Sequence, residues 1–172
     1  PTTFSMDSAM ARTVIACTTF IGGASLLLFG FFLVSGPFTL VPLDFSSAGA
    51  LFWDGFLSIL FFVQHSGMIR KSFRRWLGSH IPDHYHASAY AIASGAALML
   101  VVLLWQSPQT MLFQFQGGLR WIPRALSLLA IMGFVWGVRA LRHFDALGIA
   151  PIHAHVRGCR LSPPVFVVRG PY

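Results

Sequence analysis

The stretch TVIACTTFIGGASLLLFGFFLVS, residues 13–35, runs for 23 residues without a charged side chain. A helix needs about 20 mostly apolar residues to cross a bilayer whose apolar layer is about 30 Å thick. Three further long apolar runs follow at residues 48–64, 88–106 and 121–140. None of the four alternates in hydropathy as the strands of a membrane barrel do. The sequence therefore predicts an all-α polytopic membrane protein with four transmembrane helices.

The basic residues lie mainly on one side of these runs. Ten of the 12 lysines and arginines lie before the first run, between the second and third runs, or from the end of the fourth run onward, and Arg120 and Arg124 are the other two. Cytoplasmic connections of membrane proteins are enriched in Lys and Arg, so both termini and residues 69–87 are predicted to be cytoplasmic. We expect the partner of this charge to be the lipid bilayer and not nucleic acid, because no polar domain could present a basic surface.

Composition sets the domain organisation. The chain has 172 residues, of which 55% are hydrophobic and 10% charged, and these values leave no room for a separate soluble domain. We predict a four-helix transmembrane domain at residues 1–142 and a cytoplasmic-side tail at residues 143–172. The sequence contains no glutamate. Carboxylate-bridged di-metal sites and glutamate-rich proton relays therefore have almost nothing to be built from.

Asp54 stands out because it lies within the second apolar run. A carboxylate at membrane depth is expected to have a partner. Arg124, one turn into the fourth run from the same side of the membrane, is the predicted partner in a structural ion pair. A proton or cation site at Asp54 is the alternative.

All seven histidines map to the predicted cytoplasmic side or its boundary. His84 with His86, and His153 with His155, have the His-x-His spacing that can direct two imidazoles at one metal ion. No cysteine pair or glutamate completes either set, so we predict no metal site and regard the four as weak candidates. Gln64 and His65 end the second run. They form either a hydrogen-bonded helix end or the rim of a substrate site entered from the cytoplasm.

Five motifs occur in a recognisable order. They are FFVQHSGMIRKSFRRW at residues 61–76, LLWQ at 103–106, RHFDALGI at 142–149, HVRG at 155–158 and FVVRGPY at 166–172. The ordered set resembles the membrane methyltransferases related to methanethiol S-methyltransferase and NnrU. These in turn are similar to the isoprenylcysteine carboxyl methyltransferases. The resemblance implies methyl transfer from S-adenosylmethionine in a bacterial inner membrane, with the cofactor entering from the cytoplasm and a small or lipid-like nucleophile from the membrane side.

The resemblance places the approach to the cofactor at the end of the chain. In the family, a Gly-Pro-Tyr step leads into an Arg-His-Pro motif associated with the cofactor. Here only Gly170, Pro171 and Tyr172 match, and no Arg-His-Pro occurs. Catalytic residues therefore remain unassigned, and S-adenosylmethionine is expected to bind a longer form and not these 172 residues.

Two interpretations stay open. The chain is either the N-terminal part of a longer enzyme, or a non-enzymatic structural or accessory subunit that packs against neighbouring membrane subunits of a larger complex.

Overall fold

Four long helices dominate the computed structural model, which describes residues 2–107, 117–140 and 145–159. They are α1 (Thr2–Ser35), α2 (Ser47–Ile69), α4 (His86–Leu103) and α5 (Trp121–Ala140). Each is part of a helical stretch long and apolar enough to cross a membrane, and no strand occurs in the described ranges. The predicted all-α, four-span membrane fold is confirmed. The predicted boundary between residues 142 and 143 lies outside the described residues.

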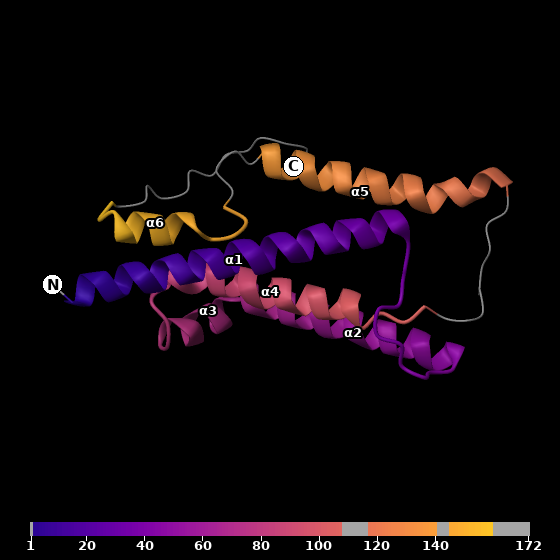
Figure 1. The fold of residues 1–172 in the computed structure, drawn as a ribbon, viewed down its shortest axis with the longest axis horizontal. Coiled ribbons are helices and arrows are strands. Elements are labelled where there is room, and N and C mark those ends of the chain that lie inside the picture. The colour runs from indigo at the N-terminus through magenta and orange to yellow at the C-terminus, as the bar shows by residue number, and fades with distance from the viewer. Residues whose placement is uncertain (1, 108–116, 141–144, 160–172) are drawn as a thin grey trace.

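The short elements lie in the connection between α2 and α4 and on either side of α5. The helix α3 (Lys71–Gly78) and the 3-10 turn η1 (Asp83–Tyr85) connect α2 to α4. The 3-10 turn η2 (Gly117–Arg120) leads into α5, and α6 (Ala150–Val156) follows it. The start of α1 lies at the same end of the molecule as α3 and α6 (Figure 1).

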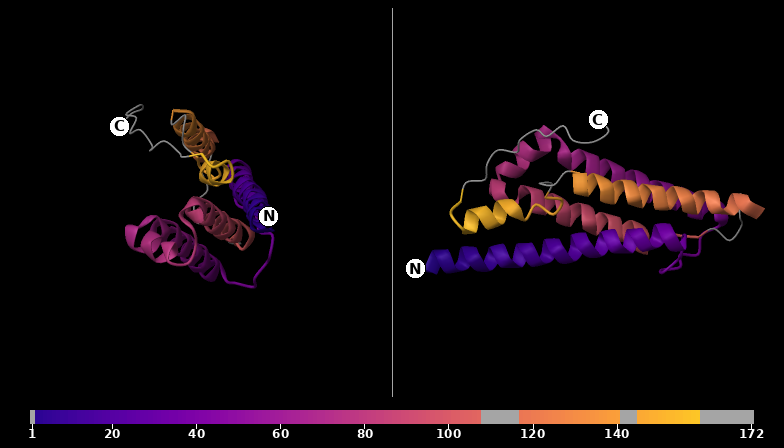
Figure 2. Two further views of the ribbon diagram at one scale, coloured as in Figure 1. Left: turned by 90° about the vertical axis from the view of Figure 1, so that its left-hand side faces the viewer. Right: turned by 90° about the horizontal axis from the view of Figure 1, so that it is seen from above.

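α4 is the centre of the bundle, in contact with α1 on one side and α2 on the other (Figures 1 and 2). Small residues allow this close approach. A Cβ atom at Gly95 of α4 would lie 3.2 Å from the Ile21 carbonyl oxygen and 3.3 Å from the Gly22 Cα of α1. Ser25 is buried at the same contact, and its hydroxyl donates to the Gly22 carbonyl at 2.9 Å. The α1–α4 interface is therefore a close backbone-to-backbone contact in which the buried Ser25 hydroxyl has a partner.

α5 packs far less closely than the other three long helices. It contacts α1, but none of the described side chains from Gly117 to Gly137 is buried. Its apolar side chains point outward, among them Leu126, Met132 and Phe134. A membrane helix can present such a surface to lipid because lipid tails are as apolar as the side chains themselves.

Gln106 ties together the end of the bundle opposite α3. Its side-chain amide donates to the carbonyls of Val41 and Leu104 at 2.8 and 2.9 Å, and its Oε1 accepts from the Leu43 N–H at 3.0 Å. Its own backbone N–H donates to Oδ1 of Asp54 at 2.9 Å. Gln106 is 4% exposed and Asp54 is 5% exposed. This Gln106 hub joins α2, the end of α4 and the connection after α1.

The hub corrects the predicted partner of Asp54. Arg124 is exposed, with its guanidinium carbon 5.3 Å from the centre of the Trp121 ring, and no ion pair joins it to Asp54 in the described part of the chain. The predicted Asp54–Arg124 pair was based on opposite charges and did not consider backbone N–H groups as partners. Asp54 lies beside the last turn of α4, where backbone N–H groups beyond the helix need acceptors.

Candidate functional site

A polar pair bridges α2 and α4 near the end of the bundle that carries α3. The hydroxyl Oη of Tyr90 lies 2.9 Å from Nε2 and 3.1 Å from Nδ1 of His65. The His65 ring stacks on Phe61, one turn earlier on α2, with ring centroids 5.3 Å apart. Both His65 and Tyr90 are partly buried. We call Gln64, His65 and Tyr90 the His65 site.

Gln64 adds an unused hydrogen-bond acceptor to the His65 site. Its amide nitrogen lies 2.8 Å from the sulfur of Met68, whereas its carbonyl oxygen Oε1 is buried and accepts no hydrogen bond from a described residue. A polar atom buried without a partner is costly, by about 1–3 kcal/mol. An orphaned buried acceptor is suited to a ligand that brings a donor or a positive charge.

Two interpretations of Gln64 and His65 were left open by the sequence. The contact with Tyr90 fits a hydrogen-bonded helix end, and the orphaned Gln64 oxygen fits a ligand site. Tyr90 itself was missed. It lies in a span rich in Ala, Ser and Gly, where the one tyrosine among small residues was the available signal.

The segment after α5 is fixed against the start of α4, two residues from Tyr90. The Ser88 hydroxyl donates to the Gly148 carbonyl at 2.6 Å, and Ser88 is fully buried. Gly148 has φ +67°, and a Cβ atom there would lie 2.4 Å from Cβ of Ala87. Farther along, Ile152 of α6 is 0% exposed and packs with Tyr85 and Ala11. Residues 145–158, which carry the end of one family-like motif and the whole of another, are thus held against the start of α4 and η1.

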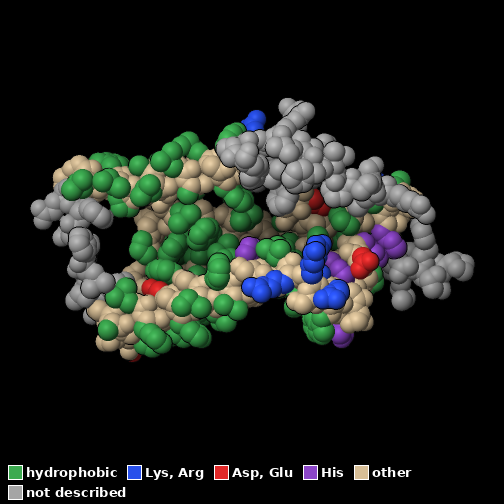
Figure 3. Space-filling view, turned by 180° about the vertical axis from the view of Figure 1, so that it is seen from behind, with side chains coloured by type: hydrophobic (Ala, Val, Ile, Leu, Met, Phe, Trp, Pro, Cys, Tyr) green, Lys and Arg blue, Asp and Glu red, His purple; other side chains and the backbone are tan. Residues whose placement is uncertain are grey.

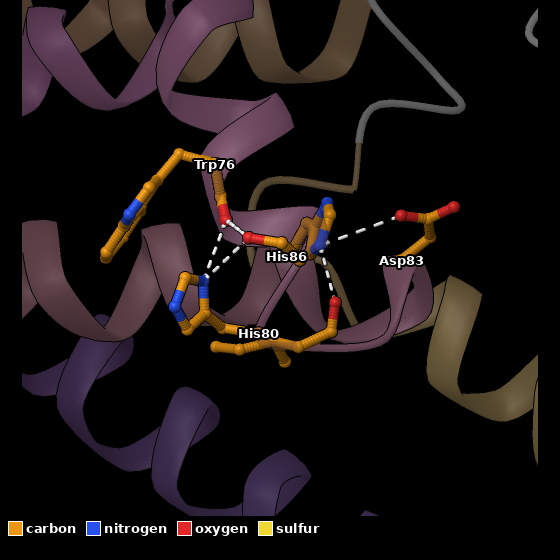
Figure 4. Close-up of polar contacts among 6 residues, drawn as sticks. Trp76, His80, Asp83 and His86 are labelled. Atoms are coloured by element: carbon orange, nitrogen blue, oxygen red, sulfur yellow. Dashed lines mark hydrogen bonds and ion pairs between the residues drawn. The ribbon is translucent and has the colours of Figure 1, made fainter.

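The histidines outside the His65 site have mainly structural contacts. His86 Nε2 lies 2.9 Å from the Ile81 carbonyl oxygen and 3.7 Å from Oδ1 of Asp83 (Figure 4). His80 Nδ1 lies 2.9 Å from the Trp76 carbonyl oxygen (Figure 4). These contacts stabilise the connection between α2 and α4.

The two His-x-His segments meet, although in a geometry unlike a chelate. His84 and His155 stack with ring centroids 3.8 Å apart and planes 10° apart, whereas His153 is exposed. Parallel stacked rings direct their in-plane nitrogens side by side and not toward one point. No group of three His, Cys, Asp or Glu able to hold a metal ion occurs among the described residues. Gly170, Pro171 and Tyr172 lie outside them.

Comparison with known proteins identifies relatives of the chain. The model of the family described as NnrU protein matches residues 55–158. A methanethiol S-methyltransferase of a Pseudomonas species is 32% identical over 147 residues, which are 78% of this chain and 53% of that protein. Methanethiol S-methyltransferase 2 of Bradyrhizobium diazoefficiens is 28% identical over 110 residues, 64% of this chain and 42% of that protein.

The relatives match this chain over only part of their own length. A third relative, the methanethiol S-methyltransferase of Pseudomonas deceptionensis, is 32% identical over 120 residues, with 67% of this chain and 42% of that protein covered. The chain thus spans about half the length of the curated relatives that it matches. No solved structure gives a significant match.

Proposed function

The chain belongs to the NnrU family, and from this premise we propose that it is the membrane-embedded part of an S-adenosylmethionine-dependent thiol methyltransferase in a bacterial inner membrane. Relatives named methanethiol S-methyltransferase support a small thiol as the methyl acceptor. The single observation that carries the proposal is the His65 site. It is a titratable ring at membrane depth that pairs with Tyr90, and the preceding residue Gln64 carries an unused buried acceptor.

The site's chemistry suits a sulfonium cofactor. Aromatic faces attract cations, and the His65 ring contacts the rings of both Phe61 and Tyr90. The orphaned Oε1 of Gln64 would also favour a positive centre. S-adenosylmethionine, when bound, supplies a methyl group on a positively charged sulfur. Gln64 and the three rings would face this sulfonium end, and the approach to the nucleoside would be Gly170, Pro171 and Tyr172.

His65 is the proposed general base. The thiolate, and not the thiol, is the nucleophile, so the thiol proton must be removed. In the tautomer whose Nε2–H donates to Tyr90 Oη, Nδ1 carries the lone pair that would accept that proton, and Tyr90 Oη lies 3.1 Å from this nitrogen too. Tyr90 then holds the ring in place and stabilises the imidazolium through the same hydrogen bond. The proton passes from the thiol sulfur to Nδ1 and afterwards to water at the membrane boundary.

A headspace assay tests the proposal. The full-length protein is expressed in a host without thiol methyltransferase activity, methanethiol is supplied, and dimethyl sulfide is measured. We expect His65→Ala to reduce kcat/KM by about 100- to 10,000-fold, the usual contribution of a general base. His80→Ala is the matched control, because His80 is exposed and its polar and ring contacts with described residues stay within its own connection.

Two outcomes would contradict the proposal. If the full-length protein forms no dimethyl sulfide while it binds neighbouring membrane subunits, the accessory-subunit interpretation is favoured. If His65→Ala methylates as fast as His80→Ala, the thiol loses its proton elsewhere.

A further inference from the structure

α3 concentrates positive charge that the described residues leave unpaired. Lys71, Arg74 and Arg75 recur at i, i+3 and i+4 and therefore share one helix face. Arg70, with φ −64° and ψ 143°, turns the chain from α2 into α3 and adds a fourth cation. All four side chains are exposed, and in the described ranges none forms a side-chain hydrogen bond or ion pair. We call these four residues and Trp76 the α3 surface.

The opposite side of α3 is apolar and fixes the helix in place. Leu77 is 7% exposed and anchors α3 on the bundle, and Phe73 is partly buried. Trp76 is 57% exposed at the edge between the two faces, with its ring centroid 4.8 Å from that of His80. A helix with a basic face and an aromatic edge is typical of the interface between lipid and water.

The position of α3 in the chain also places it at the interface between lipid and water. Ile69, the last residue of the membrane-spanning helix α2, lies two residues before α3, and the next span begins at Asp83. In the space-filling view, lysine and arginine side chains gather near the histidine-rich end of the molecule (Figure 3). The acid on this connection, Asp83, is near His86 and forms no ion pair with the α3 surface. A cluster of cations at headgroup depth therefore lacks a counter-charge among the residues that the structure describes.

We propose that the α3 surface binds the phosphate groups of anionic phospholipids in the leaflet at this end of the bundle. Guanidinium groups match phosphate oxygens in bidentate geometry. Trp76 inserts among the headgroups and sets the depth of the helix. The surface holds α3, and through Leu77 the start of α4, at a fixed depth.

Native mass spectrometry of the full chain in detergent tests this surface. Phosphatidylglycerol is titrated against phosphatidylcholine, and bound lipid is counted for each variant. We expect the wild type to prefer phosphatidylglycerol. The triple variant Lys71→Gln, Arg74→Gln, Arg75→Gln should lose about fivefold in affinity per charge, on the order of a hundredfold in all. The charge-keeping variant Lys71→Arg, Arg74→Lys, Arg75→Lys should retain most of the binding and shows that α3 tolerates substitution.

The matched control removes the same charge elsewhere. Arg120→Gln, Arg124→Gln, Arg139→Gln changes three exposed arginines at η2 and α5 and should leave phosphatidylglycerol binding unchanged. An equal loss in this control would show that net charge alone attracts the lipid and would overturn the proposal. Equal binding of phosphatidylcholine by the wild type would overturn it too. Full competition by soluble glycerol phosphate would instead assign the surface to a free anion, against the membrane partner proposed here.

Discussion

The Ser88 hydroxyl donates a hydrogen bond of 2.6 Å to the Gly148 carbonyl across 60 residues of chain. Gly148 approaches α4 so closely that only glycine fits at this position. A Cβ atom there would lie 2.6 Å from the Ser88 backbone nitrogen. This contact holds Gly148, just before α6, against the start of α4. The Ser88–Gly148 contact thus links α4 to the segment that carries α6.

Gly148→Ala should release α6 from the bundle. The substitution costs about 1–2 kcal/mol for the left-handed conformation, and overpacking adds about 1–3 kcal/mol. Gly158→Ala is the control, because Gly158 has φ +65° but open space around it. Hydrogen exchange of the α6 amides measures the local stability. Exchange that rises equally in both variants would mean that the close approach at Gly148 contributes nothing.

Asp54→Ala should destabilise the bundle through Gln106. The buried Gln106 N–H loses its acceptor, at a cost of about 1–3 kcal/mol, whereas Asp54→Asn keeps an oxygen in place and should cost less. A double-mutant cycle of Asp54→Ala with Arg124→Gln should be additive within about 0.5 kcal/mol, because the two residues share no contact. Unfolding in detergent provides the free energies. A larger coupling free energy would support the Asp54–Arg124 ion pair that the sequence predicted.

His65 as a general base predicts a specific pH profile. In His65→Ala, methyl transfer depends on thiol that has already ionised in solution, and the thiolate fraction rises with pH. The deficit relative to wild type should therefore be largest at low pH and shrink as the pH rises. His80→Ala should follow the wild-type profile throughout. A deficit of constant size across the pH range would indicate that His65 only positions other groups.

Cysteine labelling tests the predicted orientation. In a background with Cys17→Ala and Cys159→Ser, an external impermeant reagent should label Leu40→Cys but not Ser72→Cys, since the basic connection is predicted to be cytoplasmic. Both positions are exposed in the structure. External labelling at residue 72 would reverse the topology and, with it, the cytoplasmic route of the cofactor.

S-adenosylmethionine should bind the full-length protein and not the 172 residues alone. Methyl transfer depends on holding donor and acceptor in fixed positions, and the Arg-His-Pro motif associated with the cofactor does not occur in these residues. Calorimetry on both forms measures the difference. Micromolar binding by the 172-residue chain, about −8 kcal/mol, would place the cofactor site within it.

The membrane fold could be predicted from the sequence because few backbone structures can satisfy their own hydrogen bonds within lipid. Only a helix satisfies the backbone of a continuous apolar run within that run, so residues 13–35 determined a span without reference to any partner. Gln64 and His65 were recognised as polar residues at the rim of the apolar layer.

Tertiary structure alone decided which groups meet. Asp54 has Gln106 as its partner and not Arg124. This hydrogen bond depends on where α4 ends and on how α2 is aligned beside it. The positions of charges along the sequence give no information about either. Tyr90 faces His65 across 25 residues, and Ser88 meets Gly148 across 60. Apolarity is a property of each segment, and the sequence therefore determined the spans. Contacts depend on the packing of segments far apart in the chain, which only the folded molecule specifies.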